Sequence, residues 1–110
     1  MRLIALMPFL LPVMARMHKQ CICNVYDGKS WKGDWQLTFN ACTNNYPKTT
    51  EYDGGAARCI AMPHVRLDGD RWHDNCKDLA KGGYYPVVNG AIDTTKPRIF
   101  AKDGGSTCYD

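Results

Sequence analysis

The residues with the clearest chemical potential are six cysteines in a chain of 110 residues. They are Cys21, Cys23, Cys42, Cys59, Cys76 and Cys108. Metal sites need paired C-x-x-C or Cys/His clusters at ligand spacing, and redox motifs need C-x-x-C beside a βαβ unit. The gaps between successive cysteines are 1, 18, 16, 16 and 31 residues, which fit neither pattern. We therefore predict three disulfides, no metal site and no cofactor.

The N-terminal segment indicates the compartment in which these cysteines oxidise. Arg2 precedes an apolar run over residues 3–14, and Ala15 follows it. This pattern is typical of a secretory signal cleaved after Ala15. The run is shorter than the roughly 20 residues that span a membrane, so no membrane anchor is expected. We predict a signal peptide over residues 1–15 and one secreted, extracellular, cysteine-rich domain over residues 16–110.

In a short secreted chain, an even number of cysteines predicts a disulfide framework. In the chain-entropy model each bridge contributes on the order of 3 kcal/mol, which matters for a domain with a modest core. Six cysteines allow fifteen connectivities, and the sequence does not choose among them. We expect Cys21 and Cys23 to lie on opposite faces of a strand and therefore to have different partners.

Charge and length narrow the function classes. Without Arg2, 13 basic and 11 acidic residues remain, a net charge of +2. This small and interspersed charge does not predict binding to nucleic acid or to an anionic membrane. The length predicts a single domain, and we expect a monomer.

The predicted fold class is α+β: a small disulfide-stapled domain of antiparallel strands with one or two short helices. Residues 20–26 alternate as in a strand. Residues 70–81 carry one apolar stripe at helical spacing, with Asp70 as the expected N-cap. Residues 34–45 fit a strand or a helix capped by Asp34, and we favour the helix.

Four Asp-Gly dipeptides suggest turns, because Asp-Gly is favoured in tight hairpins. They begin at Asp27, Asp53, Asp68 and Asp103. Around the last one, residues 97–102 and 105–110 are predicted to form a terminal hairpin. Residues 58–67 are a further strand candidate, which Pro63 should cause to bulge or to lie at an edge.

One segment suggests catalysis. The sequence NNYPKTTEYDGG, residues 44–55, resembles the Tyr-Pro…Tyr-Glu-Gly segment of the small secreted guanyl-specific ribonucleases of fungi. That resemblance implies general acid–base chemistry. Here Lys48 stands where that family has a histidine, and the clearest predicted helix follows the segment instead of preceding it. We interpret the segment as two turns, with a ribonuclease-like protein, active or degenerate, as the alternative. Its catalytic residues would come from Glu51, His64, His73 and Arg98.

Aromatic residues in predicted loops are candidates for binding. Trp31 lies in a polar, glycine-flanked loop, whereas Trp35 and Trp72 are expected in the core. Exposed aromatic side chains on a rigid scaffold are effective binding anchors. Alternatively, the tyrosines pack over the edge of a small core. The candidate binding residues are Trp31, Tyr46, Pro47, Lys48, Tyr84, Tyr85 and Pro86.

The layout of the whole chain resembles small cysteine-rich effectors secreted by plant-associated fungi: a short signal, an early C-x-C, isolated cysteines and a final cysteine near the C-terminus. The resemblance implies a non-enzymatic virulence protein that binds a host extracellular protein and inhibits a defence enzyme such as a protease. A second alternative is an antimicrobial or killer-type toxin. The net charge of +2 argues against a membrane-active toxin.

Overall fold

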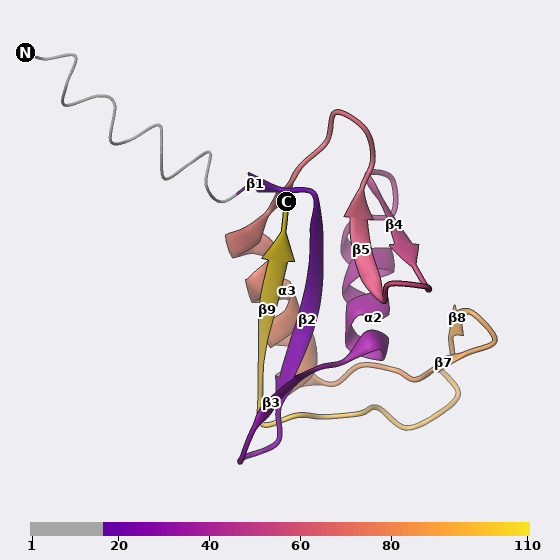
Figure 1. The fold of residues 1–110 in the computed structure, drawn as a ribbon. Coiled ribbons are helices and arrows are strands. Elements are labelled where there is room, and N and C mark those ends of the chain that lie inside the picture. The colour runs from indigo at the N-terminus through magenta and orange to yellow at the C-terminus, as the bar shows by residue number, and fades with distance from the viewer. Residues whose placement is uncertain (1–16) are drawn as a thin grey trace, which may run out of the picture.

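The computed structural model describes residues 17–110, so the predicted signal peptide lies outside the described residues. An antiparallel sheet has both helices on one face, and its other face has no helix over it (Figure 1). Its main elements in chain order are β2 (Gln20–Tyr26), α2 (Trp35–Asn45), β4 (Thr50–Asp53), β5 (Arg58–Ala61), α3 (Gly69–Gly82) and β9 (Asp103–Tyr109).

The strand order is β9-β2-β5-β4, and each neighbouring pair is antiparallel. A βαββαβ chain with this order has the split βαβ connectivity, which hosts many unrelated functions. The predicted α+β class is confirmed. The shorter strands are β1 (Met17–His18), β3 (Trp31–Gly33), β6 (Leu67–Asp68), β7 (Val87–Val88) and β8 (Ala91–Ile92).

Strand β2 is the centre of the sheet. Its buried positions are Cys21, Cys23 and Val25, so the two cysteines share the face that is covered by the helices. Our prediction of opposite faces was wrong, because residues two apart on a strand point the same way. Their partners nevertheless differ, because Cys21 lies opposite Cys108 on β9 whereas Cys23 faces Cys76 on α3.

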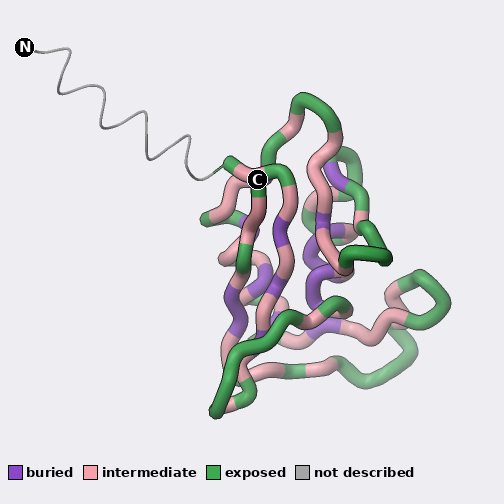
Figure 2. Tube along the Cα trace, viewed as in Figure 1, coloured by how far each residue is buried: buried purple, intermediate pink, exposed green. Residues whose placement is uncertain are grey.

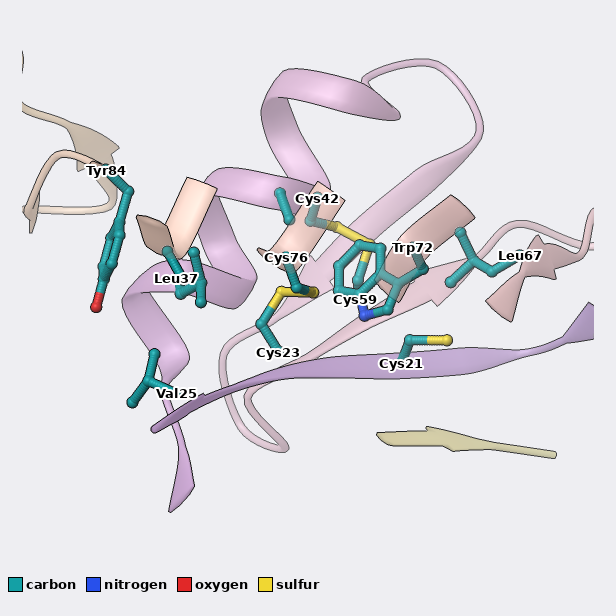
Figure 3. Packing of buried hydrophobic residues seen from close by; sticks show 12 residues of the cluster. Cys21, Cys23, Val25, Leu37, Cys42, Cys59, Leu67, Trp72, Cys76 and Tyr84 are labelled. Atoms are coloured by element: carbon teal, nitrogen blue, oxygen red, sulfur yellow. A yellow bond between two sulfur atoms is a disulfide. The ribbon is translucent and has the colours of Figure 1, made fainter. Parts of the chain in front are cut away.

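All six cysteines form disulfides, which confirms the predicted framework. The bridges are Cys21–Cys108, Cys23–Cys76 and Cys42–Cys59. They join β2 to β9, β2 to α3 and α2 to β5, so every main element except β4 is stapled. Figure 3 shows Cys23–Cys76 and Cys42–Cys59 inside the apolar cluster beside Trp72.

Helix α3 confirms the predicted helix. Trp72, Cys76 and Ala80 are its buried stripe, and the indole of Trp72 donates a hydrogen bond to the Ile22 carbonyl at 2.9 Å. The N-cap is Asp68 and not Asp70 as predicted. The Asp68 carboxylate accepts hydrogen bonds from the first free amides of the helix, which Asp70, lying inside the first turn, is not placed to accept.

The ambiguous segment is helical, as we favoured. Asp34 caps α2 by accepting a hydrogen bond from the Leu37 amide at 3.0 Å. The buried side chains of this helix include three polar or small residues, and one of them, Thr38, bonds back to the Asp34 carbonyl. Helix α2 therefore packs through a narrow and partly polar face.

Only two of the four Asp-Gly dipeptides form hairpin turns, those at Asp27 and Asp53. The dipeptide at Asp68 begins α3, and the one at Asp103 lies inside β9. The predicted terminal hairpin is wrong, because β9 pairs along the whole of β2. The strand before Pro63 ends at Ala61 instead of bulging.

Candidate binding surface

Three large aromatic side chains are exposed: Trp31 by 51%, Trp35 by 49% and Phe100 by 64%. We call them the aromatic end. Figure 1 places β3 and the start of α2 near the lower end of the sheet, opposite the upper end where β1 and the C-terminus lie, and the tube of Figure 2 is largely exposed along β3. Trp35 was predicted to be core. It is the first residue of α2, outside the buried face that begins at Leu37, and therefore points to solvent.

Trp31 is exposed, as predicted, but it lies on strand β3 and not in a loop. It pairs with Tyr26 in the β2–β3 hairpin, and the two ring centroids are 5.2 Å apart. Its ring also covers Gly105 of β9, where a Cβ atom would lie 3.2 Å from the indole. The indole is therefore half-exposed and packs against residues of β2 and β9.

Phe100 belongs to the same surface. Together with Tyr26, Asp34 and Tyr84 it lines a cavity of about 390 Å³. Its ring packs so closely on Gly83, the C-cap of α3, that a Cβ there would lie 2.8 Å from it. Trp31 and Trp35 do not line this cavity, but each neighbours a residue that does: Trp31 contacts the Tyr26 ring, and Trp35 follows Asp34 in the chain.

A second hollow lies on the other side of Asp34, where the sheet opens. Strand β3 pairs with residues 24–26 of β2 and β5 pairs with residues 20–21, which leaves a gap between them. The start of α2 fills the bottom of the gap: the Asp34 amide donates to the Cys23 carbonyl at 3.0 Å, and the Cys23 amide donates to the Thr38 hydroxyl at 2.9 Å.

Above these bonds lie two adjoining cavities of about 270 and 420 Å³ that share Trp35 and Ala57. We call the combined hollow the Trp35 groove. The side chains that give it its character are Ile22, Trp35, Tyr52, Ala57, Arg58 and Tyr109.

Arg58 is the basic residue of the groove. Its guanidinium lies 3.7 Å from the centroid of the Tyr109 ring, and its Nη1 donates to the Gln20 side chain at 3.0 Å. Asp53 is its register partner on β4, but the Asp53 carboxylate accepts hydrogen bonds from the amides of Gly55 and Ala56 in the hairpin turn. Within residues 17–110, Arg58 has no ion pair.

Of the predicted binding residues in the 84–86 segment, Tyr84 is in the core. It is 2% exposed, and its hydroxyl donates to the Asp34 carboxylate at 2.7 Å. Burial, and then this hydrogen bond, raise the pKa of Tyr84. Tyr85 is half-buried and its hydroxyl accepts a hydrogen bond from Arg98, while Pro86 is half-buried. Only the exposed parts of Tyr85 and Pro86 are therefore available to a partner.

In the 46–48 segment, Tyr46 is half-buried against Trp72, with ring centroids 5.7 Å apart. Its hydroxyl accepts a hydrogen bond from Asn75, and burial raises the pKa of Tyr46. Pro47 and Lys48 are exposed. Both predicted tyrosine sites thus contribute mainly to packing, which was our alternative interpretation.

The four residues of the ribonuclease alternative lie apart. Glu51 is on the edge strand β4, whereas His73 is on α3 at the other edge of the sheet, with its Nδ1 3.2 Å from the Ser106 hydroxyl of β9. His64 lies in the loop after β5, and Arg98 lies beside the Tyr85 ring. The structure joins His73 to Ser106 and does not bring Glu51 to it.

Two features are absent from residues 17–110. No group of three His, Cys, Asp or Glu side chains there is arranged to hold a metal ion. Neither α2 nor α3 has the length and apolar character needed to cross a bilayer. Comparisons with protein-family models, curated proteins and solved structures found no match to this chain.

Sequence reasoning missed two parts of this surface. The exposure of Trp35 had no clear sequence signal, because helical spacing places Trp35 on one stripe with Phe39 and Cys42, whereas the buried face of α2 begins at Leu37. The stacking of Arg58 on Tyr109 has no local signal, because the two residues meet only through the β5–β2–β9 order of the sheet.

Proposed function

We propose that this protein is a secreted, non-enzymatic binding protein that recognises another protein through its aromatic end. The observation that carries the proposal is the exposure of three large aromatic side chains, Trp31, Trp35 and Phe100, on a small domain stapled by three disulfides. Three disulfides in a small domain fit an oxidising, extracellular compartment.

The physical argument concerns what binding would cost. Tryptophan is enriched among the residues that dominate binding energy, because its large ring gains most from leaving water. Side chains that are already ordered lose little conformational entropy when a partner covers them. The Tyr26 and Gly105 contacts order Trp31, and the contact with Gly83 orders Phe100, before any partner arrives.

The partner in this proposal is a host extracellular protein, and a defence enzyme such as a protease is the first class to test. The cysteine layout, which resembles that of effectors from plant-associated fungi, supports this choice. Small rigid scaffolds also suit enzyme inhibition, because a pre-organised surface can bind tightly without prior ordering. The function in this view is virulence by inhibition.

The test is capture of partners from plant extracellular fluid by oxidised residues 16–110, followed by mass spectrometry and protease assays on the captured protein. The variant Trp31→Ala/Trp35→Ala/Phe100→Ala should lose the captured protein. A control variant, Met17→Ala, removes a large exposed apolar side chain, 38% exposed, from β1 near the upper end. Near-ultraviolet circular dichroism should show that both variants are folded.

One dominant protein that is retained by the wild type and by Met17→Ala but lost by the triple variant supports the proposal. If the oxidised wild type retains no protein, or the triple variant retains it equally well, the proposal is overturned. An RNA-cleavage assay with Glu51→Gln and His73→Gln would then test the ribonuclease-like alternative.

A further inference from the structure

The Trp35 groove carries a more specific inference about what the partner presents. We propose that the groove binds an acidic segment of the partner protein in which a carboxylate lies next to a large apolar side chain. This proposal rests on the proposed function, because it assumes that the protein acts by binding another protein.

The first step is the state of Arg58. Stacking on Tyr109 and the hydrogen bond to Gln20 fix the plane of its guanidinium. A guanidinium has five N–H donors, and only Nη1 has a bond to another side chain here, so most donors remain for a ligand. A planar and ordered guanidinium binds carboxylates through two parallel hydrogen bonds.

The second step is that the two nearby acids do not occupy the guanidinium donors of Arg58. Asp53 directs its carboxylate into the turn, where it accepts from the amides of Gly55 and Ala56. Asp34 accepts from the Leu37 amide with one oxygen and from the Tyr84 hydroxyl with the other. Neither carboxylate forms an ion pair with Arg58, so the unused guanidinium donors can bind an incoming carboxylate.

The third step is the apolar part of the groove. Next to Arg58 the larger cavity, about 420 Å³, is lined by Trp35, Tyr52, Gly54 and Ala57. It is large enough to admit a large apolar side chain. The two parts together fit a carboxylate and an apolar group presented by neighbouring residues of a peptide chain.

The same observations argue against nucleic acid as the occupant. Nucleic-acid affinity comes from several Lys and Arg residues that each neutralise a phosphate. The Trp35 groove has one such residue, Arg58, and the acidic residue Asp34 lies in its lining. A single carboxylate beside an apolar side chain matches this arrangement better than a chain of phosphates does.

The test uses defined peptides and NMR spectroscopy on the oxidised, ¹⁵N-labelled chain of residues 16–110. The probes are acetyl-Gly-Gly-Phe-Glu-Gly-Gly-amide, the same peptide with Glu and Phe exchanged, and the Gln counterpart of each. The signals to follow are the indole N–H of Trp35 and the Nε–H of Arg58. We expect at least one Glu peptide to shift both signals and to bind about tenfold more tightly than its Gln counterpart.

Two variants make the test specific. Arg58→Gln should abolish the preference for Glu over Gln. Arg66→Gln removes the same charge from an exposed residue in the loop between β5 and β6, and it should leave the preference unchanged. Both variants should keep the dispersed spectrum of the folded protein.

The inference is overturned if Glu and Gln peptides bind alike, if Arg58→Gln keeps the preference, or if only an eight-residue RNA shifts the two signals. Partner capture separates this failure from that of the proposed function. If Arg58→Gln still captures the partner that the aromatic triple variant loses, the proposed function stands and the inference fails.

Discussion

Helix α3 and the segment that follows it, residues 83–102, are attached to the rest of the domain by different means. Along its length the helix is attached to the sheet by the buried Cys23–Cys76 bridge and by backbone contact at Gly104, where a Cβ would lie 2.7 Å from Ala80 and from the Cys76 carbonyl. After it ends, residues 83–102 return to β9 without any disulfide. In Figure 1 this segment crosses the lower end and carries the small β7–β8 hairpin.

The 83–102 segment is held by the packing of Tyr84, Ile99 and Ala101 on the core and by polar bonds to α2 and its N-cap. Asn40 donates to the Tyr85 carbonyl at 2.9 Å, the Val87 amide donates to the Gln36 side chain at 2.9 Å, and Tyr84 donates to Asp34. Net, each such hydrogen bond contributes only about 0.5–1.5 kcal/mol. From this difference we expect α3, β2 and β9 to unfold as one cooperative unit and the 83–102 segment to open separately.

Among these predictions, the largest loss of stability is expected from removing the Cys23–Cys76 bridge, which joins α3 to β2. The variant Cys23→Ala/Cys76→Ala frees a loop with a sequence separation of 53 residues. We expect the free energy of unfolding to fall by about 4 kcal/mol, measured by urea denaturation. Cys42→Ala/Cys59→Ala, with a separation of 17, should cost about 3 kcal/mol and serves as the comparison. A larger loss from the shorter loop would contradict the central role of α3.

The close approach of α3 to β9 is the next contact to break. Gly104→Ala places a methyl group against Ala80, the Cys76 carbonyl and Lys77, so α3 must move away. We expect a loss of about 2–3 kcal/mol by thermal or urea unfolding. Gly82→Ala is the control, because nothing lies within 4 Å of the added Cβ. It should be neutral or slightly stabilising, and equal losses in both variants would refute the packing argument.

Tyr84 connects the 83–102 segment to Asp34, and its titration tests that contact. Because burial and the Asp34 hydrogen bond raise the pKa of Tyr84 above 10.0, the folded state keeps the phenol proton that the unfolded state loses. The contribution of Tyr84 to the free energy of unfolding is therefore fully present below pH 10, and it is lost as the pH rises above 10. We expect Tyr84→Phe to cost about 1–2 kcal/mol at pH 7 and to decline less steeply above pH 10.

Urea unfolding of the wild type and of Tyr84→Phe between pH 7 and pH 11 measures this difference. Tyr46 and Tyr52, whose pKa values burial also raises, remain in both proteins and account for a residual decline. If the free energy of unfolding falls equally steeply with pH in both proteins, Tyr84 does not control the loss of stability at alkaline pH.

The smallest change in the free energy of unfolding is expected from Asn40→Ala, which removes a hydrogen-bond donor to the Tyr85 carbonyl. The segment should open more readily while the sheet stays closed. We expect hydrogen exchange of the Tyr84 and Ile99 amides, which bond to each other's carbonyls, to accelerate about tenfold. Amides of β2 are the internal control. If they accelerate equally, the segment and the sheet are one cooperative unit.

Much of the framework could be predicted because it depends on neighbours in sequence. The stripe from Trp72 to Ala80 gives α3, and the alternation in residues 20–26 gives β2. The site was less predictable. Trp31 was expected on the surface and is there. Tyr84 was a candidate binding residue and is buried, whereas Trp35 was expected in the core and is exposed.

By itself, the sequence determined the α+β class, helix α3, the central strand and the presence of three disulfides, because periodicity and an even cysteine count are local or compositional properties. For residues 34–45 it favoured a helix but also fitted a strand. The tertiary structure alone decided which cysteines pair, that β9 crosses an Asp-Gly dipeptide to lie along β2, and that Arg58 meets Tyr109 beside Trp35. These features arise when distant segments become neighbours in one sheet, and the order of its strands depends on the packing of the whole chain.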